Sequence, residues 1–91
     1  MTGITFDPAK RAATLAERGL DMARAGEVFG GATLTLEDDR KDYGEPRLIT
    51  LGRLDGRMVV LVWTPREGAR RIISLRKAND REDALHGPRL G

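Results

Sequence analysis

The sequence contains no cysteine and only one histidine in 91 residues. It can therefore form no disulfide or thiolate metal site, and the lone histidine argues against a histidine-based metal site. No apolar run approaches the roughly 20 residues of a membrane span, and the N-terminus lacks the basic-then-apolar pattern of a secretion signal. These absences predict a cytoplasmic protein that needs no metal or other cofactor.

Aromatic residues are also scarce, with two Phe, one Trp and one Tyr. A protein that stacks nucleic-acid bases uses such side chains as platforms. Trp63, at the end of an apolar run, is open to two interpretations: stacking a base, or packing at the core or its rim, which is commoner for a strand-end Trp. Sequence-specific base readout is not expected.

The length allows one hydrophobic core, so we predict a single domain over residues 1–91 with residues 86–91 as a flexible tail. The net charge of +2 conceals an asymmetry. Residues 1–45 hold 6 Lys+Arg and 9 Asp+Glu, whereas residues 46–91 hold 10 and 5. This pattern fits a polyanion-binding surface, although the preference for Arg over Lys can equally follow genome composition.

The basic residues gather around one predicted hairpin. Residues 58–63 and 72–75 are apolar, rich in β-branched side chains and separated by a polar loop. Arg provides a rigid, always-charged donor fork suited to phosphate. Six cations lie in or beside the two strands, namely Arg57, Arg66, Arg70, Arg71, Arg76 and Lys77.

Two short helices are predicted before most of the sheet. Asp7-Pro8 indicates a helix over residues 9–18 that ends at Gly19, with Ala12, Leu15 and Ala16 as its apolar stripe. A second helix is capped by Asp21 and ends at Gly30-Gly31. Its apolar residues, interpreted as core, are Met22, Ala25, Val28 and Phe29.

The remaining pattern predicts an antiparallel sheet of about four strands, giving an α+β fold. Residues 33–37, with Leu34 and Leu36 inward, and residues 47–53 read as strands, and Asp55-Gly56 is a strong hairpin signal. Residues 4–6 suffice only for an edge strand, and residues 78–85 can form a terminal helix. The acidic segment around residues 38–42 matches no calcium-loop spacing and is interpreted as a solvated loop.

Glu45-Pro46-Arg47 places a carboxylate and a guanidinium at the mouth of a strand. RNA supplies its own nucleophile in the 2′-hydroxyl, so its cleavage requires only a base, an acid and cations that stabilise charge on phosphate. If Glu45 meets Arg71 or Arg76 across the sheet, it can act as the base. An ordinary salt bridge that ties the loop to the sheet is equally compatible with the sequence. His86, in the predicted tail, is interpreted as a bystander.

Several segments together resemble the BrnT family of bacterial type II toxins over about residues 6–82. The most distinctive is residues 71–78, RIISLRKA, supported by FDPAK at 6–10, GEPR at 44–47 and Trp63-Thr64. The resemblance implies a RelE-like α+β fold and a metal-independent endoribonuclease that inhibits translation. It also implies a BrnA-like antitoxin with a ribbon-helix-helix part, through which the complex would bind operator DNA.

The resemblance also implies site residues. Glu45 would be the base, and Arg47, Arg71 and Arg76 would hold the scissile phosphate. The remaining RNA contacts would come from Arg66, Lys77 and Arg18.

The chain departs from the family pattern at the end of the first helix. Members commonly carry Lys-His-Gly there, whereas this sequence has Glu17-Arg18-Gly19. A second class of function therefore stays open: a non-catalytic subunit that binds the antitoxin and modulates its DNA binding.

Overall fold

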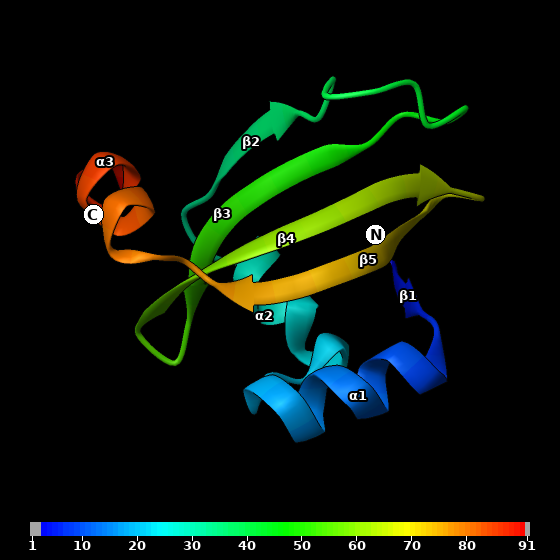
Figure 1. The fold of residues 1–91 in the computed structure, drawn as a ribbon, viewed down its shortest axis with the longest axis horizontal. Helices are drawn as coiled ribbons and strands as arrows, with labels where there is room; N and C mark the ends of the chain where they lie inside the picture. The colour runs from blue at the N-terminus through cyan, green and yellow to red at the C-terminus, as the bar shows by residue number, and fades with distance from the viewer. Residues whose placement is uncertain (1–2, 91) are drawn as a thin grey trace.

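A computed structural model describes residues 3–90 and shows a mixed α+β fold (Figure 1). Its sheet has the strand order β1-β5-β4-β3-β2. The strands are β1 (Gly3–Phe6), β2 (Leu34–Glu37), β3 (Leu48–Leu54), β4 (Arg57–Arg66) and β5 (Ala69–Lys77). The helices are α1 (Pro8–Arg18), the 3-10 turn η1 (Met22–Arg24), α2 (Ala25–Phe29) and α3 (Asp80–Leu90). The sheet therefore has one strand more than the four predicted, and a third α-helix follows the two predicted at the N-terminal end. Both lie where the sequence allowed an edge strand, at residues 4–6, and a terminal helix, at residues 78–85.

The additional strand is β1, which pairs in parallel with the first half of β5, from Gly3 opposite Ala69 to Phe6 opposite Ile72. The expectation of a wholly antiparallel sheet is wrong at this edge. A parallel pair needs a long crossover connection, and here the helices and three strands supply it. A strand this short gives no sequence signal of such a distant partner.

Two tight turns set the register of the central strands. Asp55 and Gly56 have φ values of 53° and 76°, as the predicted Asp-Gly turn requires. Glu67 and Gly68 repeat this geometry with φ values of 54° and 77°. Because the second turn lies at 67–68, β4 is longer than predicted and continues through Pro65.

The helices α1 and α2 and the turn η1 lie on one face of the sheet (Figure 1). The predicted caps are confirmed: Asp7 accepts a hydrogen bond from the Ala9 amide, and Gly19 has a φ of 68°. The core beneath these elements includes Met22, Ala25, Val28, Val59, Leu61, Ile72 and Leu75. The predicted apolar stripe of α1 is wrong, since Leu15 is 46% exposed. The helix instead buries Thr14, because it turns that side toward η1 and the edge of β5.

Helix α3 confirms the terminal helix expected at residues 78–85 but is longer, because the residues expected to form a tail are helical through Leu90. Leu90 is buried with Met58 and Val60 on the opposite face of the sheet from α2. Arg53 also donates a hydrogen bond of 3.3 Å to the Gly87 carbonyl. These contacts hold residues 86–90 against the sheet. The local sequence contains no pattern that predicts them.

Candidate nucleic-acid interface

The face of the sheet away from α1 and α2, called the open face here, carries the predicted arginines. Val59 and Leu61 point into the helix-covered core, so the alternating residues Val60, Val62, Thr64 and Arg66 point the other way. Register places Arg76 opposite Val60 and Arg71 opposite Thr64. Arg47, two residues before Ile49, shares this side because Ile49 pairs with Val62. The open face thus holds Arg47, Arg66, Arg71 and Arg76.

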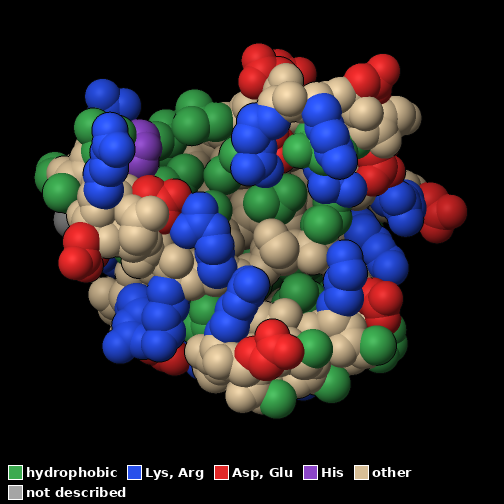
Figure 2. All heavy atoms as spheres, viewed as in Figure 1, with side chains coloured by type: hydrophobic (Ala, Val, Ile, Leu, Met, Phe, Trp, Pro, Cys, Tyr) green, Lys and Arg blue, Asp and Glu red, His purple; other side chains and the backbone are tan. Residues whose placement is uncertain are grey.

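Figure 2 looks onto this face. Lys and Arg side chains gather around its middle with apolar atoms between them, and most acidic side chains lie toward the outline. A surface of this kind suits a polyanion that also offers apolar area.

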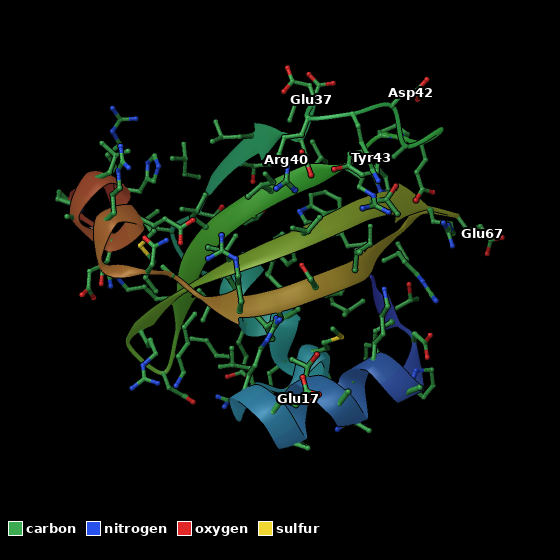
Figure 3. The ribbon with its side chains drawn as sticks, viewed as in Figure 1. Glu17, Glu37, Arg40, Asp42, Tyr43 and Glu67 are labelled. Carbon is green, nitrogen blue, oxygen red and sulfur yellow. The ribbon has the colours of Figure 1, made fainter. Side chains whose placement is uncertain are left out.

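The loop between β2 and β3 folds toward the open face instead of extending into solvent as predicted. Asp38 is only 5% exposed, and its carboxylate accepts two hydrogen bonds from Arg40, of 2.7 and 2.8 Å. The Arg40 side chain lowers the pKa of Asp38 to about 2. In Figure 3, Arg40 and Tyr43 lie toward the sheet, whereas Asp42 lies at the outer edge. The Arg47 guanidinium stacks over the Tyr43 ring at 4.0 Å.

Glu45 pairs with Arg66 at 2.8 Å rather than with Arg71 or Arg76. Arg66 lies six residues along β4 from Val60, the partner of Arg76, which is about 20 Å at 3.3 Å per residue. The structure therefore contains the salt bridge that the sequence left open. Because Glu45 is paired with Arg66, the predicted base lies about 20 Å from Arg76, near the other end of β4.

Arg76 makes a two-bond ion pair with Glu82 at the start of α3, with distances of 2.7 and 2.8 Å. This pair lowers the pKa of Glu82 to about 2. The Glu82 hydrogen bond also raises the pKa of Arg76, against the opposing effects of burial and the nearby Arg40 charge. Arg76 is thus held at the junction between the sheet and α3.

A pocket of about 440 Å³ lies at this junction. Its polar wall comes from Arg40, Ser74, Arg76, Glu82 and His86. The apolar wall includes Leu36, which is 47% exposed and not inward as predicted. Sequence reasoning set His86 aside. The signal that could have found it is its spacing of four residues from Glu82, which puts both side chains on one face of a helix.

Arg18 and Lys77, two of the predicted RNA contacts, lie away from the open face. They line a separate pocket of about 580 Å³ together with Leu15, Leu54 and Arg57. Arg18 also donates a hydrogen bond of 2.9 Å to the Leu75 carbonyl, so it covers part of the β5 edge. The structure does not bring these two cations together with Arg71 or Arg76.

Trp63 belongs to the core, the commoner of its two predicted roles. It is 9% exposed and stacks edge-on against Phe29, with 5.5 Å between ring centroids. Its indole Nε1 donates a hydrogen bond of 2.8 Å to the Thr50 hydroxyl. Tyr43, stacked on Arg47, is the aromatic side chain that lies toward the open face.

Within residues 3–90, no group of three His, Asp or Glu side chains is placed to hold a metal ion. In the same part of the chain, no helix is long and apolar enough to cross a membrane.

Comparison with known protein families finds one described as "Ribonuclease toxin, BrnT, of type II toxin-antitoxin system", which matches residues 6–82. A comparison with individual curated proteins finds no match. The family match covers the strands with the open-face arginines, the loop with Glu45 and the first residues of α3. It ends before His86. The chain belongs to the BrnT family of ribonuclease toxins from type II toxin–antitoxin systems, which have RNA as substrate and an antitoxin as partner.

Proposed function

We propose that the open face is the surface on which this toxin binds and cuts RNA. The observation that carries the proposal is the placement of Arg47, Arg66, Arg71 and Arg76 on a single face of one sheet. Guanidinium groups aligned in this way bind phosphates strongly. The bound RNA would lie across strands β3, β4 and β5.

The arginines would bind different phosphates. Arg71 and Arg76 face residues of β4 that are four positions apart, a separation of about 13 Å. Arg47 and Arg71 flank Thr64 and would hold one phosphate, while Arg76 would hold another. Glu45 can act as the base only for a phosphodiester bound near Arg66 and Arg47, because of its distance from Arg76.

The chemistry needs no metal in this proposal. The 2′-hydroxyl of RNA attacks the adjacent phosphorus, and arginines stabilise the charge that builds on the phosphate oxygens. A protein group then has only to move protons. We further propose that the fold is RelE-like and that the antitoxin is a BrnA-like ribbon-helix-helix protein. The complex would repress its own operator in the cytoplasm.

The test is cleavage of purified RNA by protein freed of its antitoxin, first without ribosomes and then with them. We expect Arg71→Ala to reduce cleavage about 10- to 100-fold, the effect of losing a charge-assisted hydrogen bond of roughly 1.5–3 kcal/mol. The matched control is Arg57→Ala. Arg57 is an exposed arginine in the pocket with Lys77, and we expect nearly unchanged cleavage.

If cleavage falls equally in the two variants, then the total positive charge of the protein determines cleavage and the position of the arginine on the open face does not. Circular dichroism of Arg71→Ala separates lost binding from lost folding. If the parent protein cuts no RNA under either condition and is harmless when produced alone, the alternative role as an antitoxin-binding subunit is favoured.

A further inference from the structure

The pocket between the open face and α3 brings together three side chains that can donate to phosphate. They come from three separate parts of the chain: Arg40 from the loop after β2, Arg76 from β5, and His86 from α3. Beside them the pocket has apolar wall residues, including Val60 and Val62. Such a mixed surface accommodates both a phosphate and the sugar attached to it.

The position of His86 follows from a chain of contacts that starts at Arg76. The Arg76 guanidinium holds the Glu82 carboxylate through two hydrogen bonds. Glu82 also forms a capping box with Asn79: it accepts from the Asn79 amide at 2.9 Å, and its own amide donates to the Asn79 side chain at 2.8 Å. His86 lies one helical turn further and therefore on the same side of α3.

The far end of α3 is fixed as well. Leu90 is 8% exposed and packs with Met58 and Val60, and Gly87 accepts a hydrogen bond from Arg53. His86 thus lies between two anchored points of its helix. Its imidazole is held in the pocket wall rather than on a mobile tail.

The two arginines of the pocket each keep capacity for a ligand. Arg40 is bound by Asp38, yet its side chain is 70% exposed. Arg76 is bound by Glu82, with 43% of its side chain exposed. Each guanidinium has five N–H donors, and a carboxylate occupies only two or three of them. The two like charges oppose one another, and an anion between them relieves that repulsion.

The ring nitrogen Nδ1 of His86 is buried and has no hydrogen-bond partner within residues 3–90. Nε2 is therefore the nitrogen that can meet a ligand in the pocket. Imidazole is also the side chain best suited to exchanging protons near neutral pH.

We propose that this pocket holds the phosphodiester that is cut, with Arg40 and Arg76 on its oxygens and His86 Nε2 as the proton donor to the leaving 5′-oxygen. The inference rests on the proposed function, and it selects the Arg76 end of the open face over the Glu45 end. Glu45, about 20 Å away along β4, takes no part in the reaction at this pocket.

In the reaction, the 2′-oxygen attacks phosphorus, so that a new P–O2′ bond forms and the P–O5′ bond breaks. The proton of the 2′-hydroxyl passes to water. The 5′-oxygen takes the Nε2 proton of the His86 imidazolium, which then regains a proton from water. The products are a 2′,3′-cyclic phosphate and a 5′-hydroxyl end.

The test compares two RNA oligonucleotides of one sequence that the protein cuts at one linkage. One has the natural 5′-oxygen at that linkage and the other has sulfur, which leaves as a thiolate without needing a proton. His86→Gln is compared with the parent protein, with Leu85→Gln as the matched control. Leu85 is its neighbour on α3 and is 62% exposed.

We expect His86→Gln to cut the oxygen substrate at least about 100-fold more slowly, the usual effect of losing a general acid. It should cut the sulfur substrate within a few-fold of the parent rate, and Leu85→Gln should match the parent on both. A purely structural role of His86 would slow both substrates equally.

Equal slowing of both substrates, or no slowing of either, would overturn the assignment of His86 while leaving the ribonuclease function intact. Loss of cleavage in Glu45→Gln with full activity in His86→Gln would move the reaction to the other end of the face. Failure of the parent protein to cut either substrate contradicts the proposed function and this inference together.

Discussion

At the scale of single residues, the Thr50 hydroxyl is a polar group held inside the protein by two hydrogen bonds. Thr50 is fully buried, and its hydroxyl accepts from Trp63 Nε1 at 2.8 Å and meets the Thr35 hydroxyl at 2.8 Å. It is the acceptor that lets the Trp63 indole lie in the core. A buried N–H left without an acceptor costs about 1–3 kcal/mol.

We therefore predict that Thr50→Val lowers the free energy of unfolding by about 1–3 kcal/mol. Valine keeps the shape and the strand preference of threonine but removes the acceptor. Denaturant unfolding followed by the fluorescence of the single tryptophan measures the change.

The control is Thr35→Val, which removes the neighbouring hydroxyl from an exposed position. Trp63 keeps its acceptor in that variant and only the bond between the two hydroxyls is lost, so we expect a smaller loss than in Thr50→Val. Similar losses in the two variants would mean that the indole hydrogen bond contributes little.

Single-residue burial was only partly predictable from the sequence. Met22 and Val28 are buried as their helical spacing indicated, whereas Leu15 and Leu36 are nearly half exposed. Alternation and helical spacing show which residues share a face. They do not show how completely other elements cover that face, and within residues 3–90 these two are only partly covered.

At the scale of elements, α2 packs closely against β3 at Gly52. A Cβ atom at this glycine would lie 2.6 Å from Val28 Cγ1 and 3.2 Å from Thr33 Cγ2. The helix can approach the strand this closely because residue 52 has no side chain. Gly52 has an ordinary strand backbone, so only this contact requires glycine.

We predict that Gly52→Ala destabilises the protein by about 1–3 kcal/mol through overpacking. Gly3→Ala is the matched control, because a Cβ there would meet nothing within 4 Å. Thermal unfolding of the two variants should show a clear loss for the first and a change within about 0.5 kcal/mol for the second. A fully stable Gly52→Ala protein would mean that α2 can shift away from the sheet without penalty.

Local elements were easier to predict than distant pairings. The caps at Asp7 and Asp21 and the turn at Asp55-Gly56 depend on residues close together in the chain, and all are confirmed. Strand β1 and the end of α3 depend on β5 and on Met58, which lie far away in sequence. No short pattern carries that information.

At the scale of the whole molecule, three carboxyl groups form close ion pairs. Two of the pairs, Arg11–Asp21 and Arg76–Glu82, join separate elements, and the third, Arg40–Asp38, lies within the loop after β2. The pKa of Asp21 is lowered to about 2 by the Arg11 hydrogen bond, that of Asp38 to about 2 by Arg40, and that of Glu82 to about 2 by Arg76. In the unfolded chain these groups take up protons near pH 4. Their contribution to stability is therefore complete above about pH 4 and is lost as the pH falls toward 2.

We predict that the melting temperature falls between about pH 4 and pH 2, because the unfolded chain binds protons before the folded protein does. Circular dichroism melts across this range provide the measurement. Asp38→Asn should melt lower than the parent at neutral pH and should show a smaller drop in acid. An equally steep drop in that variant would exclude the Asp38–Arg40 pair as a source of the acid sensitivity.

The candidate site was predictable in its chemistry but not in its layout. The sequence indicated an arginine-rich hairpin, and three of its arginines share the open face with Arg47. The separation of Glu45 from Arg76 follows from strand register, and the position of His86 follows from the docking of α3. Both are properties of the assembled sheet, which residue types alone do not determine.

The parallel pairing of β1 with β5 has a consequence for the order in which the chain folds. Gly3 pairs with Ala69, so β1 cannot pair until β5, which follows it by more than 60 residues, has been synthesised. The residues of α1 and α2 likewise have no sheet to cover until β4 and β5 have been made. Such non-local contacts slow folding. The proposed RNA-binding surface is therefore complete only after β5 has been translated, which delays the toxin's attack on the RNA of the cell that makes it.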